Sequence, residues 1–290
     1  MIAAADSYPT IQACLQSTNR LRSVSDSARL DIELLLCKVL ACSRTYLYGW
    51  PEKELSTEQQ KSFADLLDQR QAGHPIAHLI GEREFWSLPL HTNNSTLIPR
   101  PDTELLVETV LDLELPQRVR LLDLGTGTGA IALALASEKI QWDVSAVDQS
   151  AAAVELAKLN ASSLDITNVV VRQSDWFDVF TSAQLFEVIV SNPPYIDGDD
   201  PHLQRGDVRF EPASALVAGQ NGLADLFHII EGSRQFLNVD GWLVLEHGFT
   251  QALAVRQKMQ QSGYVAVTTR VDYGGNDRIT LGMYRAGGDV

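Results

Sequence analysis

Residues 119–130 read VRLLDLGTGTGA, an apolar run that leads into three glycines spaced two positions apart. The run predicts a buried strand, and GAIALALASEK, from Gly129 onward, predicts a helix. Glycines at such a turn permit a tight bend and let a ligand approach the backbone closely. The helix start also offers unpaired N–H groups, which suit a ligand carboxylate or phosphate. We therefore predict a ligand-binding loop formed by Gly125, Thr126, Gly127, Thr128 and Gly129.

Strand and helix patterns alternate on the C-terminal side of this loop. The expected strands are DVSAVD, NVVVRQSD, FEVIVSN and GWLVLEHG, and the expected helices between them are SAAAVELAKLNA and LADLFHIIEGSRQFL. This alternation is typical of an α/β protein with a largely parallel, doubly wound, Rossmann-like sheet covered by helices on both faces. The final segments, VAVTTRVD and DRITLGMY, predict two antiparallel strands that close one edge.

The N-terminal part of the chain follows a different pattern. Residues 1–72 have helical periodicity, with Ser25 or Asp26 as an expected cap and a capping box at Ser56-x-x-Gln59, so we predict a small all-α bundle. Residues 73–98 lose that periodicity and predict a connector with a short β-hairpin. The α/β domain then occupies residues 99–290.

Asp148 ends the strand that follows the glycine loop, 19 positions after Gly129. A carboxylate there can accept hydrogen bonds from both hydroxyls of a ribose. The loop alone does not separate a nicotinamide dinucleotide from S-adenosylmethionine, since Gly125-x-Gly127-x-x-Ala130 also satisfies the dinucleotide pattern.

The stretch SNPPYID, from Ser191, follows the strand FEVIV. It favours S-adenosylmethionine over a nicotinamide dinucleotide. Two prolines end the strand and remove two backbone donors. The Asn192 side-chain oxygen and the Pro193 and Pro194 carbonyls are then acceptors beside the glycine loop, and they suit a substrate NH2 group. Tyr195 can pack against a planar amide or base. A dehydrogenase needs an acid or base positioned near a carbonyl. This stretch does not indicate such a residue.

These residues resemble class I S-adenosylmethionine-dependent methyltransferases that modify planar nitrogens. Further segments narrow the resemblance to the bacterial peptide chain release factor glutamine N5-methyltransferases; they are LIPRPDTE from Leu97, DLGTGTGAIALALA, SDWF from Ser174, RFEP from Arg209 with Ala215-Leu216, and LEHG from Leu245. The matches cover residues 75–284, and a helical N-terminal domain fits the same family.

The resemblance implies a role for each site residue. The loop Gly125–Gly129 and Asp148, Trp176 and Asn192 would bind S-adenosylmethionine, with Trp176 beside the adenine. Asn192, Pro193, Pro194 and Tyr195 would hold the substrate, with Asn192, Pro193 and Tyr195 acting in catalysis.

The implied substrate is the glutamine of the Gly-Gly-Gln motif in class-1 peptide chain release factors, and its methylation would support translation termination. IPRPDTE would line the pocket, and it also suits a helix start capped by Thr103, with Asp102 and Glu104 in the first turn. Both interpretations can hold together.

Composition and charge limit the other possibilities. The net charge of −14 argues against a protein-wide nucleic-acid surface and favours basic partners. The chain has three cysteines, none in a C-x-x-C spacing, and its N-terminus lacks the basic and apolar regions of a signal peptide. We therefore predict a cytoplasmic protein with no membrane segment. We expect a monomer without a metal site. His202 beside Asp199 and Asp200 is better explained by a solvated loop, and His247 by a structural hydrogen bond.

Several alternatives stay open. An adenine-N6 nucleic-acid methyltransferase poses the same geometric problem, although DGDDPHLQRGDVRFE, with five acidic residues and two arginines, would repel a polyanion. A nicotinamide-dependent oxidoreductase and a non-catalytic module that retains the pocket are the other classes. A ribosomal-protein glutamine methyltransferase shares the chemistry and is the hardest to separate.

Overall fold

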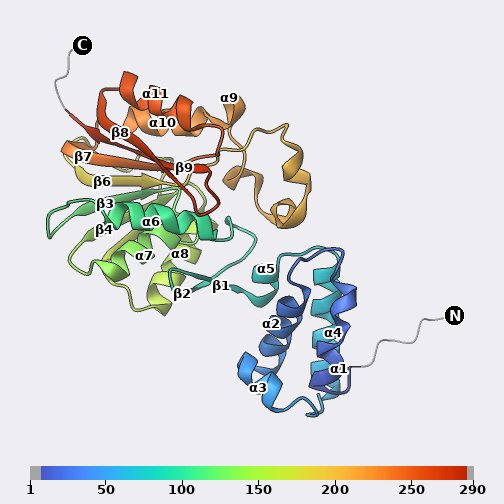
Figure 1. Cartoon of the computed structure of the whole chain (residues 1–290). Helices are drawn as coiled ribbons and strands as arrows, with labels where there is room; N and C mark the ends of the chain where they lie inside the picture. Colours follow the sequence, from blue (N-terminus) through green and yellow to red (C-terminus); the bar gives the residue numbers. More distant parts are fainter. Residues whose placement is uncertain (1–7, 286–290) are drawn as a thin grey trace. The chain divides into compact units, whose positions relative to one another are not determined.

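The computed structural model describes residues 8–285 and divides the chain into two compact units (Figure 1). One unit contains the residues up to Glu82 together with His202–Phe210, and the other contains Arg83–Pro201 and the residues from Glu211 onward. Most of the stretch MIAAADSYPT, in which no signal peptide is expected, lies outside the described residues, as do the outer ends of the two predicted domains. No helix between residues 8 and 285 is long and apolar enough to cross a membrane.

The first unit is a helical bundle around an apolar core that includes Ile32, Leu36, Phe63 and Leu67. Its helices up to the connector are α1 (Ile11–Leu15), η1 (Ser17–Arg20), α2 (Ala28–Leu40), α3 (Arg44–Gly49) and α4 (Thr57–Gln71). The capping box of Ser56 and Gln59 is confirmed at the start of α4. The cap expected for α2 is wrong, because Ser27 occupies that position and its side chain makes no capping hydrogen bond.

A segment distant in sequence also packs into the helical unit. It comprises the last three residues of η3 (Pro201–Gln204) and all of η4 (Gly206–Phe210). Arg70 is buried against Asp31, with 2.7 Å between Nε and Oδ2, and its Nη1 lies 3.2 Å from Oδ1 of Asp207. The rings of His74 and Phe210 are 4.3 Å apart between centroids. Sequence periodicity did not indicate this association, because each of these contacts joins residues far apart in the chain or within an irregular segment.

The connector contains the predicted hairpin, formed by β1 (Glu82–Phe85) and β2 (Leu88–His91). Its turn residues Trp86 and Ser87 both have positive φ, 52° and 59°. The connector also contains a short helix, α5 (Ile76–Ile80), which the loss of periodicity did not predict. Five residues are too few to produce a repeating apolar pattern.

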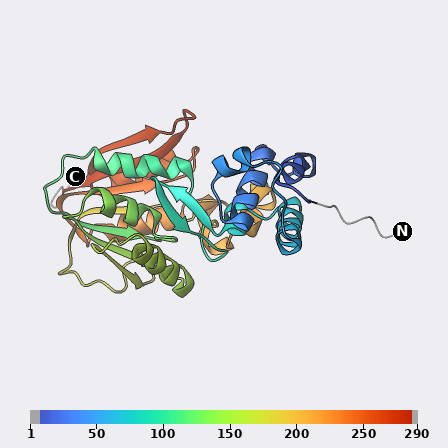
Figure 2. The ribbon, with the colours of Figure 1, turned by 90° about the horizontal axis from the view of Figure 1, so that it is seen from below.

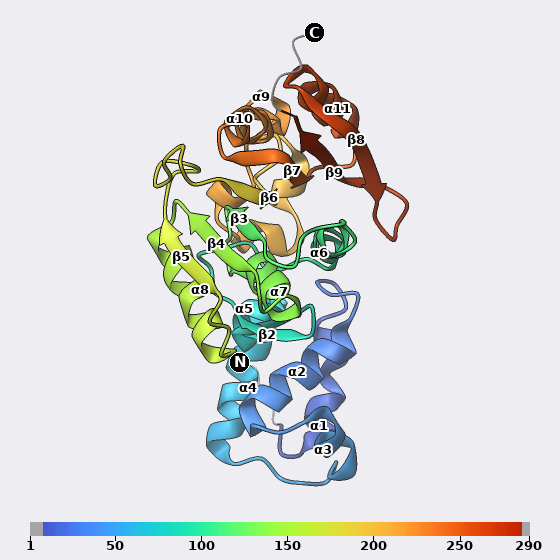
Figure 3. The same cartoon turned by 90° about the vertical axis from the view of Figure 1, so that its left-hand side faces the viewer.

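The second unit is built on a seven-stranded sheet of order β5-β4-β3-β6-β7-β9-β8 (Figures 2 and 3). Its strands are β3 (Arg120–Leu124), β4 (Asp143–Asp148), β5 (Val169–Gln173), β6 (Phe186–Ser191), β7 (Leu237–Glu246), β8 (Tyr264–Val271) and β9 (Asp277–Tyr284). The first five are parallel, and β9 runs antiparallel to both β7 and β8. The predicted doubly wound sheet with antiparallel final strands is therefore confirmed.

Helices cover both faces of this sheet and create two apolar cores. They are α6 (Glu104–Leu111), α7 (Ala130–Glu138), α8 (Ala151–Ser163), α10 (Ala224–Ser233) and α11 (Ala252–Gln261). The second unit also contains the short segments η2 (Pro101–Thr103), η5 (Ala213–Ala215) and α9 (Gly219–Gly222). Strand alternation sends Leu121 into the core beneath α6 and α7, and Leu122 into the core beneath α10 and α11. The chain leaves β3 toward β4 on one side, while β6 pairs with β3 on the other. Ligands bind at such a switch point, outside the carboxyl ends of the strands.

Candidate functional site

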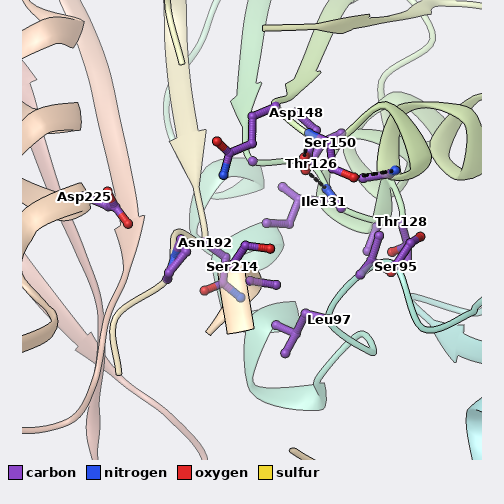
Figure 4. A pocket seen from close by; sticks show the side chains of 18 of the residues that line it. Ser95, Leu97, Thr126, Thr128, Ile131, Asp148, Ser150, Asn192, Ser214 and Asp225 are labelled. Carbon is purple, nitrogen blue, oxygen red and sulfur yellow. Dashed lines mark hydrogen bonds between the residues drawn. The ribbon is translucent and has the colours of Figure 1, made fainter. Parts of the chain in front are cut away.

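A cavity of about 300 Å³ lies at the carboxyl ends of β3, β4 and β6 (Figure 4). Figure 4 shows Asn192 and Asp225 toward one side, Ser95 and Thr128 toward the other, and Asp148 above Leu97. The predicted site residues that line the cavity are Gly125, Thr126, Gly127, Thr128, Asp148, Trp176, Asn192 and Pro194. Gly129, Pro193 and Tyr195 are not among the lining residues. The sequence patterns therefore converge on one cavity, although some of their residues lie behind its wall.

The glycine loop depends on backbone conformations that glycine alone adopts readily. Gly125, Gly127 and Gly129 have φ of 70°, 56° and 85°. A Cβ at Gly129 would lie 3.0 Å from Cδ1 of Leu133 and 3.3 Å from Cβ of Ala157. Gly129 therefore permits the close packing of α7 against α8, while Gly125 and Gly127 leave the loop backbone open to the cavity.

Asp148 supports the loop as well as facing the cavity. Its Oδ2 accepts a hydrogen bond from the Gly127 N–H at 3.0 Å, and its Oδ1 accepts one from the Ser150 N–H at 2.9 Å. Burial raises the pKa of the Asp148 carboxyl, and these two N–H groups act in the opposite direction. Each oxygen retains acceptor capacity for a ligand hydroxyl.

Trp176 lies on the same wall and has an unusual backbone. Its φ is 41°, a left-handed conformation uncommon for an aromatic residue. A Cβ placed on Gly125 would be 3.7 Å from the Trp176 ring. This geometry holds the indole beside the glycine loop, where it can contact a planar ligand group.

Hydrogen bonds join Ser191, the last residue of β6, to the end of β3, and the following residue, Asn192, to η2. The Ser191 hydroxyl donates to the Leu124 carbonyl at 2.7 Å, and the Asn192 Nδ2 donates to the Thr103 Oγ1 at 3.2 Å. Pro194 reaches the cavity, whereas Pro193 is buried behind it. Asn192 and Pro194 therefore line the same cavity as the glycine loop.

Tyr195 packs into the second core with its hydroxyl directed at a buried carboxyl. The hydroxyl donates to Oε1 of Glu246 at 3.1 Å, and the Tyr195 carbonyl accepts from Nε2 of Gln251 at 3.0 Å. Burial raises the pKa of the Tyr195 phenol. A Cβ on Gly222 would lie 2.1 Å from the Tyr195 carbonyl oxygen. The backbone of Tyr195 is thus held from two sides.

The IPRPDTE stretch and the RFEP motif brace one another. Arg100 Nη2 lies 2.6 Å from Oε2 of Glu211, whose Oε1 accepts from the Ile98 N–H at 3.1 Å. The expected capping by the Thr103 side chain is wrong, because Thr103 makes no capping hydrogen bond to α6 and contacts Asn192 instead.

His247 makes the structural hydrogen bonds expected of it. His247 is fully buried; its Nδ1 lies 2.9 Å from the Gly248 carbonyl oxygen and its Nε2 lies 2.7 Å from the Thr280 hydroxyl. No group of three or more metal-ligating side chains occurs within the part of the chain that the structure describes.

Several cavity residues escaped the sequence patterns. They are Ser95, Thr96, Gln149, Ser150, Ala153, Ser214, Val217 and Asp225. Gln149 and Ser150 could have been found, because they directly follow the strand end at Asp148. Asp225 had no such signal: it is the second residue of α10 and reaches the cavity only through the packing of that helix.

Two family models match the chain in consecutive regions. Residues 12–81 match "PrmC N-terminal domain", and residues 100–224 match "Methyltransferase small domain". The first match falls on the helical unit, and the second contains the glycine loop, Asp148, Trp176 and the Asn-Pro-Pro-Tyr motif.

Solved structures support the fold of the second unit. A methyltransferase from Pyrococcus furiosus has a TM-score of 0.52 and 17% identity, and the match covers 68% of this chain and 89% of that one. A 16S rRNA N2 G1207 methyltransferase from T. thermophilus has a TM-score of 0.51 and 19% identity, covering 70% of this chain and 50% of that one. At these identities the similarity shows the fold alone.

Curated relatives match nearly the whole chain. The protein from Shewanella oneidensis is 54% identical over 91% of this chain and 92% of its own length. The protein from Vibrio cholerae is 52% identical over 95% of this chain and 97% of its own, and that from Escherichia coli is 55% identical over 90% and 94%. All three are named release factor glutamine methyltransferase. Identity at this level over nearly the whole chain places this chain in the release factor glutamine methyltransferase family.

Proposed function

We propose that this protein transfers a methyl group from S-adenosylmethionine to the side-chain nitrogen N5 of a release factor glutamine. The observation that carries the proposal is the position of Asn192 and Pro194 on the wall of the cavity that contains the glycine loop. An amide acceptor beside a ligand-binding loop suits a substrate with an NH2 group. The membership in a family of this activity supports the same conclusion.

The cavity residues fit S-adenosylmethionine, which supplies an electrophilic methyl on a sulfonium. Asp148 has acceptor capacity for ribose hydroxyls, and the Trp176 ring offers a planar surface for adenine. Gly125 and Gly127 let the ligand approach the loop backbone. Cavities of this size accept small ligands. The product would be S-adenosylhomocysteine.

The protein's contribution to the transfer is orientation and charge stabilisation. An amide nitrogen is a poor nucleophile because its lone pair is delocalised into the carbonyl. Acceptors at Asn192 and Pro194 would hold the two hydrogens of the NH2 group, so that the lone pair faces the methyl in line. These acceptors also stabilise the positive charge that develops on the nitrogen. One N–H proton becomes acidic as the methyl arrives and passes to water, without a dedicated general base.

The substrate proposed is the glutamine of the Gly-Gly-Gln motif in class-1 peptide chain release factors, whose methylation supports translation termination. Glycines beside the glutamine would let a narrow backbone deliver the side chain to Asn192. The helical unit would contact the folded factor away from this motif, which would offset the entropy cost of ordering a glycine loop. We place the protein in the cytoplasm, acting as a monomer and without nucleic acid as a direct partner.

The test compares native protein and Asn192→Ala with intact release factor, a Gly-Gly-Gln peptide and adenine-containing DNA. Mass spectrometry after incubation with labelled S-adenosylmethionine should find methyl on the glutamine of the intact factor, and much less on the peptide. Asn192→Ala should lower turnover by about 10²–10³, the usual cost of a lost transition-state hydrogen bond. Calorimetry should find nearly native cofactor affinity. Methyl found only on DNA, or native turnover in the variant, would overturn the proposal.

A further inference from the structure

The Asn192 amide is held by a side chain that belongs to another element. Its Nδ2 donates to Oγ1 of Thr103, a buried residue of η2, at 3.2 Å. A threonine hydroxyl has one proton and can accept as well as donate. Because its oxygen accepts from Asn192, the Thr103 proton is free to point toward a different acceptor.

The candidate acceptor is Glu246, at the end of β7. Glu246 is only 1% exposed, and its Oε1 accepts a hydrogen bond from the Tyr195 hydroxyl at 3.1 Å. Its Oε2 makes no hydrogen bond to any residue that the structure describes. The Thr103 hydroxyl acts to lower the pKa of the Glu246 carboxyl, against the effect of burial. A buried carboxylate with spare acceptor capacity will therefore draw the Thr103 proton.

This arrangement determines which end of the Asn192 amide reaches the cavity. While Glu246 attracts the Thr103 proton, Thr103 offers Asn192 an acceptor, so the NH2 end turns toward Thr103. The oxygen then turns toward the cavity. In the opposite orientation the Asn192 NH2 group would meet the NH2 group of a substrate, and the two sets of donors would repel each other.

We propose that Thr103 and Glu246 are positioning residues, which together hold Asn192 with its oxygen ready to accept from the substrate nitrogen. This inference rests on the proposed function for the identity of the substrate, and on the geometry alone for the orientation of the amide. Neither residue needs to touch the reacting atoms. Their effect passes through a single amide.

The arrangement should respond to pH, since only an ionised Glu246 accepts on both oxygens. Burial raises the pKa of Glu246 to about 7. The hydroxyls of Thr103 and Tyr195 and the charge of Arg278 on β9 lower this pKa, and the charge of Asp102 raises it. A protonated Glu246 becomes a donor toward Thr103, which can then donate to the Asn192 oxygen. We expect the productive orientation above about pH 7 and its loss as the pH falls.

The orientation can be measured without turnover by nitrogen-15 NMR of the full chain with S-adenosylhomocysteine. The side-chain NH2 signals of Asn192 are identified by their absence in Asn192→Asp. They should shift with pH with a midpoint near that of Glu246, and this response should vanish in Glu246→Gln, which cannot ionise. The proposal would be overturned if the Asn192 signals of the native protein did not shift with pH, or if they shifted in Glu246→Gln as they do in the native protein.

Turnover of intact release factor provides the second arm. Thr103→Val keeps the side-chain shape without the hydroxyl and should lower kcat by about 10- to 100-fold, as loss of an orienting partner typically does. Thr103→Ser should recover most of this loss. The matched control is Thr109→Val on α6, since Thr109 is equally buried and donates only to the Leu105 carbonyl. Its kcat should stay native.

The two arms separate the possible failures. If the native protein does not methylate release factor, the proposed function fails, while the NMR response still tests the amide orientation. If Thr103→Val melts far below the native temperature, Thr103→Ser and Glu246→Gln carry the test. Native kcat and a native pH profile in folded Thr103→Val would refute the positioning role.

Discussion

Replacing Asp148 by alanine should weaken S-adenosylmethionine binding by about 3 kcal/mol. Asp148 lines the cavity, and its two oxygens already accept from the N–H groups of Gly127 and Ser150. Hydrogen bonds to a charged group contribute about 1.5–3 kcal/mol each. Asp148→Ala removes two hydrogen bonds to the ribose hydroxyls, and water partly compensates for them in the variant. The net cost is therefore near the upper value for a single such hydrogen bond. That cost corresponds to a roughly 100- to 200-fold rise in Kd.

The structure also predicts that Asp148→Asn will bind nearly as weakly as Asp148→Ala. An asparagine has only one acceptor atom, so its NH2 end must face the N–H group of either Gly127 or Ser150. The two donors would repel each other and displace the loop. An account in which Asp148 contacts only the ligand predicts a milder effect for asparagine, because one acceptor for the ribose would survive.

Isothermal titration calorimetry with S-adenosylmethionine measures both Kd values, and thermal melts of the ligand-free variants show that they are folded. Asp143→Ala is the matched control, since Asp143 begins the same strand at its opposite, exposed end. Its Kd should be native. A folded Asp148→Ala whose Kd lies within threefold of the native value would refute the role of Asp148.

Three further predictions follow from the buried groups, the backbone and the net charge. Gly222→Ala should lower turnover and stability, because its Cβ would lie 2.1 Å from the Tyr195 carbonyl oxygen. Gly263→Ala is the control for backbone strain, since Gly263 has a similar φ and open space around it. Equal effects of the two substitutions would contradict the steric argument. Burial raises the pKa of Asp123 to about 7, so the native state keeps a proton that the unfolded state loses near pH 4, and stability should fall as pH rises between these values. Asp123→Asn should remove up to about 4 kcal/mol of that fall in chemical denaturation, and an unchanged slope would count against it. Finally, the net charge of −14 should make association with a basic release factor slower as salt rises, and stopped-flow rates independent of salt would exclude electrostatic steering.

The regular part of the fold was predictable from local sequence because each element has its own signal. Strands such as β6 are short apolar runs bounded by turn residues, and the capping box of Ser56 and Gln59 fixes the start of α4. What could not be predicted depends on contacts between distant residues. The association of His202–Phe210 with the helical unit needs partners more than 100 positions away, such as Arg70 and Asp207.

The candidate site shows the same division. Motif residues at strand ends, such as Asp148 and Asn192, were placed by the rule that parallel strands end at one edge. Thr103 was expected to cap a helix, since its local sequence fits that role. Its actual partner, Asn192, is 89 positions away, and no local pattern reports such a contact.

The contribution of His202–Phe210 to the helical unit has a consequence for cutting the protein into pieces. A single cleavage after Glu82 would give a small fragment that carries Arg70 and His74, and a large fragment that still carries Asp207 and Phe210. The surface that binds these two residues would belong to one fragment and the residues themselves to the other. We therefore expect the fragments to reassociate when mixed, as in fragment complementation, so that neither region behaves as an interchangeable module.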